Sequence, residues 1–133
     1  MFTLTIHPDA RSDLEELWRT SRTAFARISV LLEQIRADPH LLDALTDHAF
    51  GLERREAFTV SRIESQWHKG KDLWRLKIWD LDAQNLPYRI VYGYEIRRHR
   101  YHVLGVIHRS NYNYEPDHPF TQRILRAYDD VCT

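Results

Sequence analysis

Cysteine, methionine and glycine are scarce in this chain, which has one, one and four of them in 133 residues. Because Cys132 has no second cysteine to pair with, an internal disulfide is excluded and a reducing compartment is favoured. The chain also lacks an apolar run of the roughly 18 residues that a membrane-spanning helix needs. Its first residues show no basic patch followed by an apolar segment. We therefore expect no membrane partner, no secretory signal and a cytoplasmic location.

The chain has no net charge, because 19 basic residues balance 19 acidic ones. The charges are nevertheless unevenly distributed along the sequence. Residues 51–113 hold 12 basic and 7 acidic side chains, a net charge of +5, whereas residues 1–50 and 114–133 carry −3 and −2. A ligand responds to the local field rather than to the total charge. The sequence thus predicts a positively charged middle segment between acidic flanks.

Internal repeats, low-complexity tracts and linkers rich in glycine or serine are also absent, which predicts a single domain over residues 1–133. Three short runs rich in β-branched and aromatic residues predict three strands: Leu73–Leu81, Tyr88–Tyr94 and Tyr101–His108. The connections between these runs are too short for crossover helices, so an antiparallel meander is expected. The third run is apolar on both faces, as in a strand with neighbours on both sides.

The flanking segments predict helices and one further strand. Residues 2–6 alternate apolar and polar side chains, as an edge strand does. Apolar stripes predict a helix that opens at His7-Pro8-Asp9 and breaks at Thr20-Ser21, a longer helix up to Asp38 and a short helix ended by Gly51. A final helix follows Asp117, a candidate N-cap, and residues 58–60 are a further candidate strand. The expected fold class is α+β: a small twisted antiparallel sheet, formed by the N-terminal strand and the meander, with N-terminal helices on one face and a C-terminal helix.

Basic side chains recur on the three predicted strands at positions that share a face. The period of two places Arg75 and Lys77 on one face of the first strand, and the second strand adds Arg89. Arg109 lies at the end of the third strand. Cations that converge beside aromatic rings are typical of a site for a polyanion. The candidate site residues are Arg75, Lys77, Arg89, His108, Arg109, Tyr112 and Tyr114.

Each of these residues also has a structural interpretation. Arg75 and Lys77 are compatible with a solvated strand face, and Tyr112 or Tyr114 with simple packing. A charge in an apolar strand needs a partner or a ligand, and for Arg89 the candidate partners are Asp80, Asp82 and Glu95. The eight histidines do not predict a metal site, because no cysteine or carboxylate completes a ligand set around His99 and His102. His108 is a candidate acid or base, because imidazole titrates near neutrality.

The runs WRLKIW, PYRIVYGY and VLGVIHRSNY, in this order after an N-terminal strand and helix pair, resemble the RelE/ParE superfamily of bacterial type II toxins. Within it, the RelE and HigB mRNA endonucleases are the more similar. The resemblance matches Arg75 and Lys77 to two basic residues on one strand and Arg89 to a phosphate-binding arginine. Arg109 matches an arginine at the end of the next strand. A tyrosine follows in the family, and Tyr112 and Tyr114 both fit that position.

The resemblance implies a ribosome-dependent mRNA endonuclease in which a ribose 2′-OH attacks the adjacent phosphate without metal or cofactor. Its partners would be a cognate antitoxin, the ribosome and mRNA. Lys77 would act as base or charge stabiliser, Arg75 and Arg89 would hold the phosphate, and Arg109 with a tyrosine would orient the leaving group and base. Two alternatives stay open. One is a ParE-like gyrase poison, although such proteins lack the basic set, and the other is a non-catalytic RNA- or protein-binding module, which the neutral composition favours.

Overall fold

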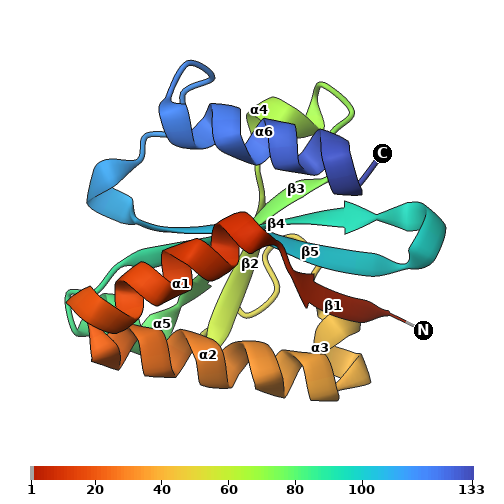
Figure 1. The fold of residues 1–133 in the computed structure, drawn as a ribbon. Helices are drawn as coiled ribbons and strands as arrows, with labels where there is room; N and C mark the ends of the chain where they lie inside the picture. Colours follow the sequence, from red (N-terminus) through yellow and green to blue (C-terminus); the bar gives the residue numbers. More distant parts are fainter. Residues whose placement is uncertain (1) are drawn as a thin grey trace.

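A five-stranded sheet in the order β1-β5-β4-β3-β2 forms the centre of the computed structural model, which describes residues 2–133 (Figure 1). Its strands are β1 (Thr3–Ile6), β2 (Phe58–Arg62), β3 (Leu73–Ile78), β4 (Tyr88–Glu95) and β5 (Arg100–His108). The α+β class is confirmed, and β5 lies between two neighbours as expected. The sheet is mixed rather than antiparallel, because β1 pairs parallel to β5, and β2 adds an antiparallel strand at the other edge.

Within the described residues, six helices and two 3₁₀ turns accompany the sheet: α1 (Pro8–Thr20), α2 (Arg22–Ala37), α3 (Pro39–Ala44), α4 (Glu64–Trp67), α5 (Trp79–Ala83), α6 (Pro119–Val131), η1 (Ile96–Arg98) and η2 (Arg109–Asn111). Proline begins three of the helices, a position where the missing backbone N–H costs nothing. The residue before each proline is extended, as proline requires, and its side chain accepts a bond from the first turn. The sequence therefore specifies these helix starts locally.

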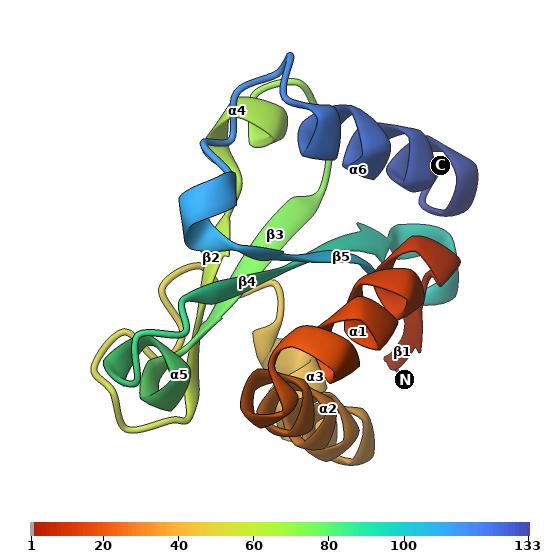
Figure 2. The ribbon, with the colours of Figure 1, turned by 60° about the vertical axis from the view of Figure 1, so that its left-hand side comes forward.

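The sheet separates two apolar cores, and Figure 2 shows α6 on one side of it with α1 and α2 on the other. The larger core packs the apolar stripes of α1 and α2 on side chains such as Leu76, Ile90 and Val103. The smaller core packs α6 on Leu73, Val91 and the residues around them. At Gly105, an added Cβ would lie 2.7 Å from Phe120 of α6, so glycine permits the close approach of that helix.

Three local predictions were wrong. The first meander strand ends at Ile78 rather than Leu81, because residues 79–83 form α5 with two aspartates in its first turn, where the helix dipole favours carboxylates. The short helix ends at Ala44, and Gly51 instead occupies a turn at φ 75°, where a Cβ would lie 1.9 Å from a backbone oxygen. The N-cap of α6 is His118 rather than Asp117. No helix in residues 2–133 is both long and apolar enough to cross a membrane.

Candidate functional site

The sheet register brings the predicted cations together on the face that carries α6. Lys77 pairs with Arg89 across β3 and β4, and Arg75 lies two residues earlier on the same face. α6 packs over the other end of this face, above Gly93 and Gly105. Beyond the helix lies a pocket of about 260 Å³, here called the cationic pocket. It is lined by Leu52, Thr59, Ser61, Arg75, Lys77, Trp79, Arg89 and Arg109.

Arg89 is the most buried of the four cations, with 8% of its surface exposed. Its guanidinium forms a two-pronged bond with Asp82 of α5, with Nη1–Oδ1 and Nη2–Oδ2 distances of 2.9 and 3.2 Å. Of the three carboxylates considered as partners from sequence, the structure selects Asp82. This pair fixes the orientation of Arg89 and compensates its charge. Four cations and this one carboxylate leave the group with a net charge of +3.

The other three cations form no ion pair with any residue in the described range 2–133. All three instead contact aromatic rings, Arg75 and Arg109 that of Tyr114 and Lys77 that of Trp79. The guanidinium of Arg75 lies 4.7 Å from the centre of the Tyr114 ring, and the ammonium of Lys77 lies 4.7 Å from that of Trp79. Such contacts orient a cation without cancelling its charge. These side chains therefore keep their electrostatic attraction for an anion.

The two candidate tyrosines have different surroundings, although the centres of their rings lie 4.4 Å apart. Tyr112 is buried beneath α6, and its hydroxyl lies 2.7 Å from the hydroxyl of Thr121. Burial raises the pKa of Tyr112, which makes it a poorer proton donor. Tyr114 lies instead between Arg75 and Arg109, whose guanidinium is 5.8 Å from its ring. Its backbone is left-handed at φ 63°, an uncommon state for a bulky residue that often marks functional sites.

His108 does not lie in the cationic pocket. Its neighbour Ile107 pairs with Arg89, so the period of two turns His108 to the face that carries α1. There its ring contacts Tyr88 edge-on at 5.0 Å, and its Nδ1 accepts the backbone N–H of Ser110. Arg109 does reach the pocket, and its Nη1 donates to the backbone oxygen of Tyr112 at 3.2 Å.

Sequence reasoning missed the side of the pocket that is formed outside the meander. α5 supplies Trp79 and Asp82, and the loop over residues 45–57 supplies Leu52. The indole N–H of Trp79 donates to the Gly51 oxygen at 3.1 Å, which fastens this loop to the pocket. The guanidinium of Arg54 lies 4.4 Å from the centre of the same indole. The sequence identified Asp82 as a candidate partner of Arg89, whereas no local pattern predicted that the loop over residues 45–57 lines the pocket.

Comparison of the chain with protein-family models, curated proteins and solved structures finds no match. The resemblance to the RelE/ParE superfamily therefore stays a prediction that rests on the residues themselves. Within residues 2–133, no three histidine, cysteine or acidic side chains are grouped so as to hold a metal ion.

Proposed function

We propose that this protein is the toxin of a type II toxin–antitoxin pair, a cytoplasmic, metal-independent endoribonuclease of the RelE type that cleaves mRNA on the ribosome. The observation that carries the proposal is the convergence of Arg75, Lys77, Arg89 and Arg109 in one small pocket with a net charge of +3. A phosphodiester is an anion of suitable size for such a pocket. The order of these residues along the chain is the order that the resemblance requires.

The proposed chemistry is attack of a ribose 2′-OH on the adjacent phosphorus, followed by departure of the 5′-oxygen. The 2′-OH gives up a proton, the phosphate gains negative charge in the transition state, and the leaving oxygen takes up a proton. Arg89, held in place by Asp82, and Arg75 are preorganised to stabilise the developing charge. Of the lining side chains, Lys77 is suited to exchange a proton, because an arginine stays charged. Tyr114 contacts both Arg75 and Arg109 through its ring and so helps to orient these two cations.

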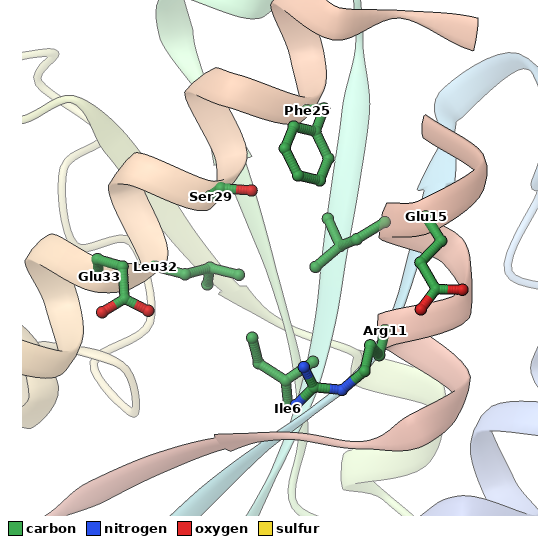
Figure 3. A pocket seen from close by; sticks show the side chains of 8 residues that line it. Ile6, Arg11, Glu15, Phe25, Ser29, Leu32 and Glu33 are labelled. Atoms are coloured by element: carbon green, nitrogen blue, oxygen red, sulfur yellow. The ribbon is translucent and has the colours of Figure 1, made fainter. Parts of the chain in front are cut away.

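The proposal includes a cognate antitoxin as a partner. Figure 3 shows a pocket between α1 and α2, about 320 Å³ in volume, with Phe25 and Leu32 among its apolar walls. Arg11, Glu15 and Glu33 surround these walls with charges of both signs. An amphipathic segment of an antitoxin fits this chemistry. Such a partner would wrap the N-terminal helices rather than fill the cationic pocket.

The alternative is an RNA- or protein-binding module that cleaves nothing. The observation that favours it is the Arg89–Asp82 pair, since one of the four cations already has a structural partner. The position of His108 on the opposite face favours it as well, because the pocket then lacks a second proton-transfer group from β5. The basic set argues against a ParE-like gyrase poison.

The test is induced expression in a bacterial host, with growth measured and mRNA 5′ ends mapped. Lys77→Ala and Arg109→Ala should each relieve growth inhibition and remove the new 5′ ends, because loss of one transition-state cation costs about 10²–10³ in rate. Arg97→Ala, which removes an exposed arginine of η1, is the matched control and should stay toxic. Co-expression of the antitoxin should restore growth. Full toxicity of both pocket variants, at wild-type expression, would exclude the nuclease.

A further inference from the structure

A second concavity adjoins the cationic pocket and shares Arg109 with it. Its volume is about 420 Å³, within the range of roughly 300–1,000 Å³ typical of sites for small organic groups. η2 and the loop that leads to α6 form it. It is lined by Arg109, Ser110, Asn111, Tyr112, Asn113 and His118. Apart from Arg109 these side chains are neutral amides, hydroxyls and rings, and none is a carboxylate.

The two concavities therefore differ in chemistry although they touch. The cationic pocket concentrates charge, which suits a phosphate. The second one offers directional hydrogen bonds beside rings, which suits a planar heterocycle such as a nucleobase. A nucleotide carries both groups, joined through a ribose. We infer that the second concavity is a base-binding site for a nucleotide whose phosphate occupies the cationic pocket.

Hydrogen bonds within the protein determine which groups remain for a base. The Oδ1 of Asn113 accepts the backbone N–H of Glu115 at 3.1 Å, so its amide nitrogen keeps two donors. The Nδ1 of His118 accepts the backbone N–H of Phe120 at 3.0 Å, so the neutral ring carries its proton on Nε2. The side chain of Asn111 forms no hydrogen bond with the residues that the structure describes, and it can donate or accept. The hydroxyl of Ser110 donates to Nδ1 of His108 at 2.7 Å, so its oxygen remains as an acceptor. With the Arg109 guanidinium included, the site still offers a base more donors than acceptors.

Excess donors favour a base edge with adjacent acceptors. Guanine presents O6 and N7 as such a pair, and cytosine presents its ring nitrogen and O2. Adenine instead sets an amino donor next to each of two acceptors, so it satisfies fewer of these groups. The site is therefore selective for guanine or cytosine over adenine. This inference rests on the proposed function only in assuming that the cationic pocket holds a nucleic-acid phosphate.

The test is fluorescence anisotropy with labelled heptanucleotides that are identical except for a central A, C, G or U. Every nucleotide carries 2′-deoxyribose, so none can be cut and binding is measured apart from cleavage. The wild-type protein should prefer G or C over A by about tenfold, since a two-point base contact is worth roughly 1–3 kcal/mol. Asn111→Ala and Asn113→Ala should reduce that preference to below about threefold without weakening binding of the A-centred oligonucleotide.

Two control variants separate this site from its neighbour. Lys77→Ala should weaken binding of all four oligonucleotides equally, because it removes a contact with phosphate. It should also reduce by about one the slope of the logarithm of the binding constant against the logarithm of the salt concentration. Gln34→Ala, which removes an exposed amide of α2, should change nothing. Binding without base preference, or a preference that survives both asparagine variants, overturns the base site and leaves the cationic pocket intact. If no oligonucleotide binds, both the base site and the phosphate-binding role of the cationic pocket are overturned.

Discussion

Glu95, at the end of β4, is a residue whose surroundings change its ionisation. Its Oε1 lies 2.9 Å from Nε2 of His102, whose Nδ1 lies 3.0 Å from the hydroxyl of Thr5. The chain of contacts joins β4, β5 and β1 across the sheet. The hydrogen bond with His102 lowers the pKa of Glu95 and outweighs burial, which acts in the opposite direction, while the nearby charges of Arg98 and Arg100 lower it further. Folding therefore favours the ionised carboxylate.

This lowered pKa predicts how stability depends on pH. A carboxylate whose pKa is lowered by folding stabilises the folded protein fully at a pH above its ordinary pKa of about 4.3. This contribution to the free energy of unfolding is lost as the pH falls through the pKa of the folded state. Glu95→Gln, which removes the charge but keeps an acceptor for His102, should lower the free energy of unfolding by about 1–2 kcal/mol at pH 7. The two proteins should converge as the pH falls below about 4.

Urea unfolding from pH 3 to pH 7 measures the effect. Glu33→Gln, at an exposed position of α2, is the control and should follow the wild-type profile. A constant difference between wild type and Glu95→Gln at all pH values would show that the carboxylate contributes packing rather than charge.

At the scale of elements, Asp13 of α1 connects the two helical layers. Its carboxylate receives both terminal nitrogens of Arg123 from α6, at 2.9 and 2.6 Å, and the backbone N–H of Val106 at 2.9 Å. β1 ends opposite Val103, so the rest of β5 has no strand on that side. Asp13 occupies this edge and satisfies one of its amides. The hydrogen bond with Asp13 also raises the pKa of Arg123.

Asp13→Ala should lower the free energy of unfolding by about 2–3 kcal/mol, because it leaves a half-buried arginine and a strand N–H without a partner. Glu33→Ala breaks an exposed pair with Arg36 on α2 and should cost at most about 0.5 kcal/mol. Urea unfolding at pH 7 compares them. In the double variant Asp13→Ala/Arg123→Ala, the free energy of unfolding should fall by less than the sum of the decreases in the two single variants. Equal stability of Asp13→Ala and Glu33→Ala would contradict the role of Asp13.

Local sequence pattern predicted the helices and strands whose own residues show a clear periodicity or a helix-start residue. Helices α1 and α6 follow from apolar stripes and proline starts, α2 follows from its apolar stripe, and the meander follows from short apolar runs. Strand direction has no such signal, so the parallel pairing of β1 was not accessible from residues 2–6 alone. α5 was misassigned because its apolar residues alternate with aspartates as in a strand, whereas these aspartates form ion pairs with Arg27 of α2 and Arg89 of β4.

The site residues likewise include some that local pattern could place and others that it could not. The cations of β3 and β4 could be grouped from the period of two alone, and the same rule, applied to Ile107 and His108, separates His108 from them. Tyr112 and Tyr114 also differ by two, but they follow the strand in a loop where no period applies. Only the fold shows that Tyr112 reaches Thr121 in the core, while Tyr114 lies beside Arg75.

At the scale of the whole molecule, the chain is neutral, but four of its cations gather in the cationic pocket with a single carboxylate beside them. The cationic pocket opens on the side of the sheet that carries α6, and the groove between α1 and α2 lies on the other side. If the proposed function holds, RNA and the antitoxin would therefore bind opposite faces of the sheet. Its net charge of zero limits non-specific attraction to nucleic acid far from the pocket.

The cationic pocket supplies charge stabilisation more fully than proton transfer, and this predicts that cleavage depends on the ribosome. Holding reactants in an attack geometry contributes up to roughly 7–11 kcal/mol, so an mRNA positioned in the decoding site can supply what the pocket lacks. Even about 4 kcal/mol of this corresponds to a factor of about 10³ in rate. We therefore expect ribosome-bound mRNA to be cut at least about 10³-fold faster than the same RNA in free solution.

Cleavage by purified protein, with and without ribosomes programmed with one mRNA, measures this ratio. Lys77→Ala should abolish the fast reaction, whereas His108→Ala should retain it, because His108 lies on the opposite face of the sheet from the pocket. The competing possibility is that His108 moves into the site and acts as a self-sufficient acid or base. Free RNA would then be cut at a similar rate, with a bell-shaped pH profile that His108→Ala removes. Equal rates with and without ribosomes would therefore exclude substrate positioning as the missing contribution.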